Sequence, residues 1–190
     1  MSIILQELQK TETLMQTLQK AEYVKTIEKI GQSCVVSILG GGKIMFAGNG
    51  GSAADAQHWA AELIARFNYD RPSIAAIALT TDTSALTAIG NDYGYEYSFS
   101  RQVEGLGRSG DVLIAISTSG NSPNILKAVE VAKAKGIYTI GFTGKDGGKL
   151  KEECDFCLVI PSNETAHIQE GHAVVGHILC NIIETTIHPK

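Results

Sequence analysis

From residue 43 onward, short apolar runs alternate with stretches of helical periodicity. The runs that predict strands cover 43–48, 73–79, 111–117, 137–143 and 154–160, and helices are expected over 51–67, 83–90, 95–106, 122–136 and 165–187. Strands that alternate with helices form right-handed crossover units and a parallel sheet covered on both faces. The pattern therefore predicts an α/β fold, a three-layer α/β/α sandwich around a five-stranded parallel sheet.

The segment before this alternation has a different character. Apolar residues recur at helical spacing over residues 3–38, and three glycines at 40–42 end the pattern. We expect an N-terminal helical arm over 1–40, as one long or two shorter helices, ahead of an α/β core over 41–190. The length of 190 residues fits one domain. The arm's apolar stripe needs cover, from the core or from another subunit.

Composition excludes several classes of function. Sixteen Lys and Arg against 20 Asp and Glu give a net charge of −4, so no basic excess is available for nucleic acid. The apolar runs are far shorter than the roughly 20 residues of a membrane-spanning helix. Acidic and amide side chains interrupt the first twelve residues, where a signal peptide would be apolar. We therefore expect a cytoplasmic protein without a nucleic-acid or membrane partner.

The four cysteines are Cys34, Cys154, Cys157 and Cys180, too few and too scattered for a disulfide framework. Cys154 and Cys157 form a CxxC, but the second CxxC of a zinc site is missing. Alternation along a strand predicts that these two side chains point to opposite faces. Reduced thiols are the expected state.

A glycine-rich loop, Gly48 to Ala54, follows the first predicted strand and opens a helix. Its glycines let the backbone approach an anion, which the free N–H groups and the positive end of the helix dipole favour. The loop lacks the lysine of a P-loop, and Ala53 breaks the G-x-G-x-x-G spacing of dinucleotide sites. The alternative is a tight turn without a ligand.

A second loop of this kind, residues 117–123, follows the third predicted strand. It carries the four hydroxyls of Ser117, Thr118, Ser119 and Ser122. A helix cap explains one or two of these side chains. Neutral donors combined with a helix dipole suit a small phosphorylated metabolite that must bind and leave.

His58 and Glu62 stand four residues apart on the helix that begins at the glycine loop. This spacing places an imidazole and a carboxylate on one helical face, as a metal site or an acid–base pair requires. A solvated pair is the alternative. Arg66 lies one turn further, where it could orient the carboxylate, contact phosphate or form a surface ion pair.

These segments carry a resemblance. The motifs GNGGSAADAQH, ISTSGNS, TAIGNDYGYE, TGKDGG and IQEGHAVVGH, in this order, resemble the sugar isomerase (SIS) family of phosphosugar-binding domains, and within it the phosphoheptose isomerases. The resemblance covers essentially the whole chain and implies a flavodoxin-like SIS fold. It also implies isomerisation of sedoheptulose 7-phosphate to D-glycero-D-manno-heptose 7-phosphate through an enediol. The product would be a precursor of activated heptose for lipopolysaccharide core or another surface glycan. The enzyme would be a homotetramer.

The resemblance also implies roles for individual residues. Glu62 and His177 match the proton-transfer groups, and His58, Glu62, Gln169 and His177 match the ligands of one zinc ion per subunit. Asn91 and Asp92 match positions near the sugar hydroxyls, although Asp92 is also a candidate cap for the following helix. The full set expected to bind substrate is Asn49, Gly50, Gly51, Ser52, Glu62, Asn91, Asp92, Ser117, Thr118, Ser119, Ser122 and Gln169.

The spacing of Gln169 and His177 poses a geometric problem. Eight residues of straight helix separate them by about 12 Å along the axis. Both reach one ion only if the helix is irregular near Gln169, if long side chains converge, or if another subunit supplies one of them. His172 lies on a different helical face and is expected to be a core residue, and His167 stands where we expect Arg or Lys in relatives.

Two other functions compete with this one. A non-catalytic SIS tetramer could bridge copies of a DNA-replication initiator, and an isomerase or lyase could act on another phosphosugar. Glu62 and its histidine partners favour an enzyme over a scaffold, which has no use for them. The closing motif IQEGH followed by His177 favours the heptose enzyme.

Overall fold

The computed structural model describes residues 2–190 and contains a five-stranded parallel sheet in the order β2-β1-β3-β4-β5. The strands are β1 (Ile44–Gly48), β2 (Ala76–Ala78), β3 (Val112–Ile116), β4 (Tyr138–Gly144) and β5 (Phe156–Ile160). This is the flavodoxin-like order, in which the chain changes direction across the sheet between β1 and β3. Ligands of such sheets bind beyond the carboxyl ends of these two strands.

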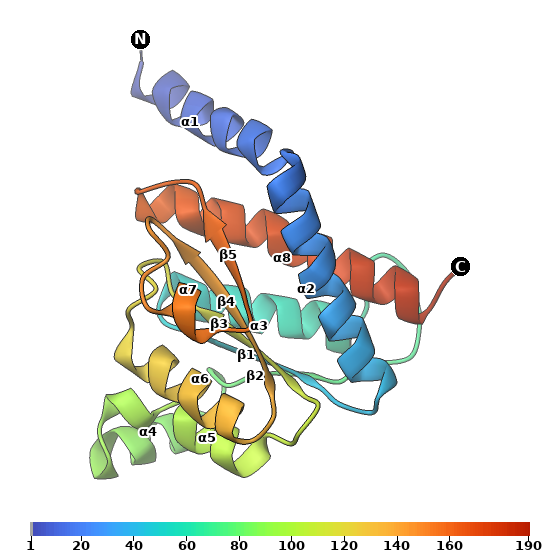
Figure 1. Ribbon diagram of the computed structural model, residues 1–190, viewed down its shortest axis with the longest axis vertical. Helices are drawn as coiled ribbons and strands as arrows, with labels where there is room; N and C mark the ends of the chain where they lie inside the picture. The colour runs from blue at the N-terminus through green and yellow to red at the C-terminus, as the bar shows by residue number, and fades with distance from the viewer. Residues whose placement is uncertain (1) are drawn as a thin grey trace.

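Helices cover both faces of the sheet, which confirms the predicted three-layer sandwich (Figure 1). One layer holds α2 (Ala21–Leu39), α3 (Gly51–Ile64) and α8 (Thr165–Ile187), and α1 (Ile3–Leu18) extends from it. The other side holds α4 (Thr83–Asp92), the 3₁₀ turn η1 (Tyr95–Tyr97), α5 (Ser100–Leu106), α6 (Pro123–Ala134) and α7 (Leu150–Glu153). The short α7 was not predicted, because four residues are too few for a periodic pattern.

Each face of the sheet has its own apolar core. Ile44 and Phe46 of β1 face the layer of α2, α3 and α8, whereas the alternate residues Met45 and Ala47 face α5 and α6. Every residue of β1 and of β3 is buried. Such doubly buried strands read as continuous apolar runs in the sequence, which is why they were predicted without alternation.

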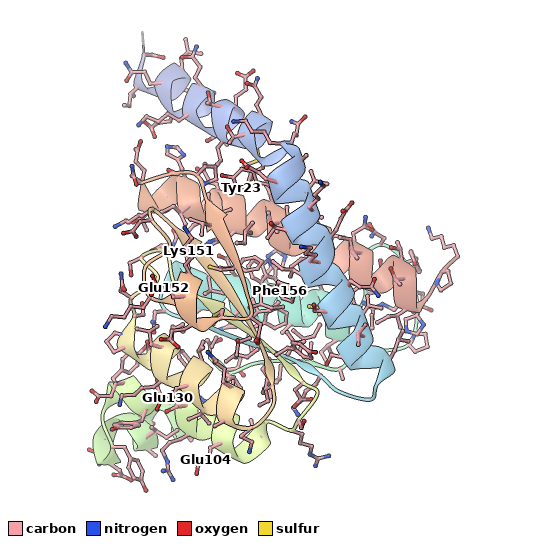
Figure 2. The ribbon with its side chains drawn as sticks, in the orientation of Figure 1. Tyr23, Glu104, Glu130, Lys151, Glu152 and Phe156 are labelled. Carbon is pink, nitrogen blue, oxygen red and sulfur yellow. The ribbon has the colours of Figure 1, made fainter. Side chains whose placement is uncertain are left out.

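The N-terminal segment forms two helices, broken at Gln19 and Lys20. α2 packs along α8 as part of its layer, and Tyr23, near the bend, packs against the same core (Figure 2). α1 projects further and leaves Ile3, Ile4 and Leu8 more than 60% exposed. Within residues 2–190, no helix has the length and apolar character needed to cross a membrane.

His167 ties α1 to the start of α8. Its Nε2 lies 3.1 Å from Oε2 of Glu7, and its Nδ1 lies 2.9 Å from Oε2 of Glu170. The hydrogen bond that His167 donates to the Glu170 carboxylate is the main cause that raises the pKa of His167. The side chain of His167 is 6% exposed. In this chain, therefore, the position connects the arm to α8.

The prediction that the side chains of Cys154 and Cys157 point to opposite faces of the sheet is wrong. The sulfur atoms of Cys154 and Cys157 each lie 3.2 Å from the point that a Cβ on Gly141 would occupy. The two converge because Cys154 precedes β5 and does not follow its alternation. All four cysteines are free, and burial raises the pKa of Cys154 to about 12, consistent with inert, reduced thiols.

A buried ion pair locks the end of α3 to α8. Nη2 of Arg71 donates to the backbone oxygen of Glu62 at 2.8 Å, and Nη1 donates to that of Leu63 at 2.7 Å. Nε of the same guanidinium lies 3.2 Å from Oε1 of Glu184, and the two side chains are 2% and 0% exposed. Arg71 therefore satisfies two of the last carbonyls of α3, while Glu184 balances its charge.

Glu184 is held by further donors. Its two carboxylate oxygens accept hydrogen bonds from the backbone N–H groups of Phe67 and Asn68 at 2.9 and 2.8 Å. Burial alone would raise the pKa of Glu184, but these bonds and Arg71 outweigh it and hold the pKa below its ordinary value of 4.5. The carboxylate is thus charged in the folded protein at neutral pH.

We predict that Glu184→Gln lowers the free energy of unfolding by about 3 kcal/mol at neutral pH, because it leaves the Arg71 charge buried and unpaired. A group with a lowered pKa stabilises the fold above its unfolded pKa and loses this effect as the pH falls through its folded pKa. The difference between variant and wild type should therefore shrink below about pH 4.5. Urea denaturation at several pH values measures it.

Glu96→Gln is the matched control. Glu96 forms a long 3.9 Å pair with Lys127 and is 52% exposed. Its replacement should leave the free energy of unfolding unchanged within error. Equal stability of the two variants would contradict the role assigned to Glu184.

Candidate active site

The glycine loop between β1 and α3 has the tight geometry expected of it. Gly50 has φ +56°, a left-handed conformation that glycine adopts without strain. A Cβ on Gly48 would lie 2.4 Å from the backbone oxygen of Ser52, so the helix can start this close to the strand only at a glycine. The first turn of α3 thus begins at the carboxyl end of β1, where the N–H groups of Ser52 and Ala53 donate to the backbone oxygens of Asn49 and Gly50 at 3.0 Å.

The hydroxyls of the second loop, between β3 and α6, converge. Oγ of Ser117 lies 2.9 Å from Oγ of Ser122 and 3.5 Å from Oγ of Ser119. The backbone N–H of Asn121 donates to Oγ of Ser119 at 3.2 Å. Three of the four predicted hydroxyls are therefore in one cluster, and Thr118 lies between Ser117 and Ser119.

Two amide side chains join the loops to each other. Asn49 and Asn124 exchange hydrogen bonds of 2.9 Å through their side chains. The hydroxyl of Tyr95 donates to Oδ1 of Asn49 at 2.9 Å. Asn49, a predicted substrate residue, is thus also the link between the loops. Asn124 and Tyr95 were not identified from the sequence, because their contacts span 75 and 46 residues.

His58, Glu62 and His177 form the second half of the site. Nε2 of His58 lies 3.1 Å from Oε1 of Glu62, and the ring centroids of His58 and His177 are 4.8 Å apart at 79°. One potential ligand atom from each residue lies within 4.8 Å of the others. Phe67 stacks on His177, with centroids 5.9 Å apart and planes at 16°.

A glycine sets the distance between the helices that carry these residues. A Cβ on Gly176 of α8 would lie 2.0 Å from Cε2 of Trp59 on α3. Trp59 and Gly176 are the sequence neighbours of His58 and His177. The close approach therefore brings the two imidazoles together.

Gln169 is on α8, and its side chain lies at the start of α3. A Cβ on Gly51 would lie 2.5 Å from its Nε2, which places the amide over the start of α3. Since α8 is helical from Thr165 to Ile187, an irregular helix start near Gln169 is wrong. Long side chains or a second subunit remain as the ways in which Gln169 could join the metal ligands.

The other predicted residues lie outside this cluster. Asn91 and Asp92 are exposed at the end of α4, and Nδ2 of Asn91 donates to Oδ1 of Asp92 at 2.7 Å. The suggestion that Asp92 caps the next helix is wrong, because Gly94 occupies the cap position of η1. Arg66 is exposed just beyond α3, and Arg71 makes the buried contacts instead.

Asp55 is a residue of the site that sequence reasoning missed. It lies one turn before His58 on α3, and burial raises its pKa against the lowering effect of the His58 and His177 imidazoles. The i, i+3 spacing to His58 was the available signal. Its carboxylate adds negative potential beside the two histidines.

The residues present fit a zinc ion. Two imidazoles and one carboxylate are donors of the types that zinc binds in catalytic sites, where a fourth position stays open to water or substrate. His58 is 53% exposed and Glu62 24%, so the cluster is accessible from solvent. The absence of thiolates makes it a site of modest affinity.

Comparisons with known proteins identify the family of the chain. The SIS domain family matches residues 8–144. The phosphoheptose isomerase of Burkholderia pseudomallei (strain 1710b) is 60% identical over 165 residues, which cover 87% of this chain and 84% of the relative. That of Sulfurimonas denitrificans is 53% identical over 97% of this chain and 95% of its own. The chain belongs to the phosphoheptose isomerase family.

Solved structures of phosphoheptose isomerases share the fold. The one from Neisseria gonorrhoeae has a TM-score of 0.90 and 43% identity, and covers 96% of this chain and 97% of its own. The one from Francisella tularensis has a TM-score of 0.92 and 37% identity, and covers 96% of each chain. Membership in the phosphoheptose isomerase family makes the chain an isomerase, as its motifs predicted.

We predict that Gly176→Ala reduces isomerase turnover at least tenfold, because the new Cβ forces α8 away from Trp59 and separates His177 from His58 and Glu62. The methyl group adds helix propensity, but overpacking outweighs it and costs about 1–3 kcal/mol. Turnover and urea denaturation measure the two effects.

Gly105→Ala on α5 is the control, since a Cβ there meets nothing within 4 Å. It should leave turnover unchanged. Wild-type turnover in Gly176→Ala would show that the helix approach does not set the site geometry.

Proposed function

We propose that this member of the phosphoheptose isomerase family converts sedoheptulose 7-phosphate into D-glycero-D-manno-heptose 7-phosphate through an enediol. The product would enter activated heptose synthesis for lipopolysaccharide core or another surface glycan. The observation that carries the proposal is the convergence of Glu62 with His58 and His177 within 4.8 Å, in a chain that also clusters hydroxyls at the end of β3.

The two loops suit the phosphate end of the substrate. Hydroxyls and backbone N–H groups bind the dianion without a fixed counter-charge, aided by the helix dipoles of α3 and α6. The residues proposed for this end are Asn49, Gly50, Gly51, Ser52, Ser117, Thr118, Ser119 and Ser122. Asn91, Asp92 and Gln169 are proposed for the sugar hydroxyls.

The cluster suits the reacting carbons. Glu62 would take the proton from C1 of the ketose, leaving an enediol, and return it at C2 to give the aldose. His177 would move the hydroxyl proton between O2 and O1, so that charge does not accumulate on either oxygen. Phe67, stacked on His177, fixes the plane of that imidazole.

We also propose one zinc ion per subunit, held by His58, Glu62 and His177, with Gln169 as the fourth ligand. When bound, it would polarise the sugar oxygens as a Lewis acid. A metal-bound carboxylate is a weaker base, so the two roles of Glu62 compete. Asp55 adds negative charge beside His58, which favours a cation there.

A homotetramer is the proposed assembly, formed by the whole chain as one SIS domain. Its support is an apolar groove of about 440 Å³ between the arm and α8. Val174 and Ile178 line it and are each 40% exposed. α1 adds a row of exposed apolar side chains that a second copy could cover. Four free thiols are consistent with the proposed cytoplasmic location.

The competing functions account for less of the site. A protein that bridges a replication initiator needs no carboxylate 3.1 Å from an imidazole in an accessible cluster. An isomerase or lyase of another phosphosugar would share the phosphate loops. The identity to phosphoheptose isomerases, up to 60%, favours the heptulose substrate over those sugars.

We predict that Glu62→Gln lowers kcat for sedoheptulose 7-phosphate by about a thousandfold while the fold and the oligomer persist. The amide keeps the shape of the side chain and removes its basicity. A coupled assay for the aldose product, with circular dichroism and size-exclusion chromatography, measures the outcome.

Glu130→Gln is the matched control, on the outer surface of α6 (Figure 2). It should retain wild-type kcat. If Glu62→Gln also turned over at the wild-type rate, another group would be the base and the proposed mechanism would fail.

A further inference from the structure

One buried histidine remains outside the proposed chemistry. His172 lies in the first half of α8, three residues after Gln169 and five before His177, and is 0% exposed. Its Nε2 lies 3.0 Å from the backbone oxygen of Thr143, at the carboxyl end of β4. Since a carbonyl only accepts, Nε2 carries the proton and donates it.

The other ring nitrogen has no partner within residues 2–190. Nδ1 is buried without a hydrogen bond, and burial lowers the pKa of His172 to about 4. The imidazole is therefore neutral at physiological pH, with one tautomer selected by Thr143. An unpaired buried nitrogen costs stability, and the hydrogen bond to Thr143 is the polar contact that the ring makes within residues 2–190.

The peptide group that accepts from His172 also donates. It joins Thr143 to Gly144, and the N–H of Gly144 donates to the backbone oxygen of Thr118 at 3.2 Å. Thr118 belongs to the hydroxyl loop. One peptide plane thus lies between the imidazole on α8 and the backbone of that loop, and each bond polarises the other.

Packing holds this arrangement in place. A Cβ on Gly144 would lie 2.3 Å from Cδ1 of Ile168, so α8 rests directly on the peptide. The ring of Phe142 lies between those of His172 and Trp59, with both centroid distances 5.5 Å. The ring of His172 therefore packs on Phe142, which in turn packs on Trp59, the sequence neighbour of His58.

We propose that His172 is a positioning residue that sets the backbone of the phosphate loop through the Thr143–Gly144 peptide. α8 would then control both ends of the site, the reacting end through His177 and the phosphate end through His172. The inference rests on the proposed function, since it requires that the loop of Thr118 binds phosphate.

His172→Phe tests this proposal, because it keeps the ring packing on Phe142 and removes the N–H donor. We expect KM for sedoheptulose 7-phosphate and the dissociation constant for inorganic phosphate to rise together by about tenfold, the scale of one lost hydrogen bond. kcat should change less than threefold. Zinc binding, measured in parallel, should be unchanged because the His58 cluster is intact.

His172→Gln is the rescue variant, since its amide nitrogen reaches as far as Nε2 and can donate to Thr143. Its KM and phosphate dissociation constant should lie within about threefold of wild type. Equal values for the Phe and Gln variants, or wild-type values in the Phe variant, would overturn the proposal and reduce His172 to a packing residue.

A fallback variant and a fallback measurement cover the cases in which His172→Phe does not fold or the wild type has no turnover. If His172→Phe does not fold, His172→Asn replaces it, because its shorter amide has the same burial cost as Gln but does not reach Thr143. The Asn variant should then show the weakened binding. If the wild type has no turnover, the proposed function fails, and phosphate titration calorimetry still decides the positioning role. A wild type that neither turns over sedoheptulose 7-phosphate nor binds phosphate overturns both.

Discussion

The close contact between Trp59 and Gly176 is the constraint on which the site depends. Since a Cβ at position 176 would lie 2.0 Å from the indole, α3 and α8 approach more closely than side chains on both helices would allow. The residues next in sequence, His58 and His177, consequently face each other with Glu62 one turn away. The Arg71–Glu184 pair holds the far end of the same two helices, and Glu184 also orders the backbone of Phe67, which stacks on His177.

The sheet supplies the second half of the site by topology. β1 and β3 are neighbouring parallel strands, and the helices that follow them, α3 and α6, cover opposite faces of the sheet. The glycine loop and the hydroxyl loop therefore open at the same edge of the sheet. Asn49 and Asn124 join them directly. The carboxyl end of β4 then connects the hydroxyl loop to α8 through the Thr143–Gly144 peptide. The two halves are therefore parts of one packed unit, in which α8 contacts both.

The sequence predicted what depends on local pattern. Buried strands such as Val112–Ile116 and the closing helix Thr165–Ile187 follow from apolar runs and periodicity. β2 was expected over 73–79 but is only Ala76–Ala78, because an edge strand pairs on one side and Ile77 is 36% exposed. His58 and Glu62 were found by spacing. Glu184 and Arg71 were not, since 113 residues separate them and only the folded packing brings them together. Asp55 was overlooked although its signal was local.

Turnover of three phosphosugars by the purified protein tests the central claim most directly. Sedoheptulose 7-phosphate, fructose 6-phosphate and ribulose 5-phosphate are assayed side by side, each with and without a chelator. The account predicts turnover of the heptulose alone, lost on chelation and restored by zinc. Turnover of the hexose or pentose instead, or of none of the three by the folded protein, would contradict the assignment of this site to heptulose isomerisation.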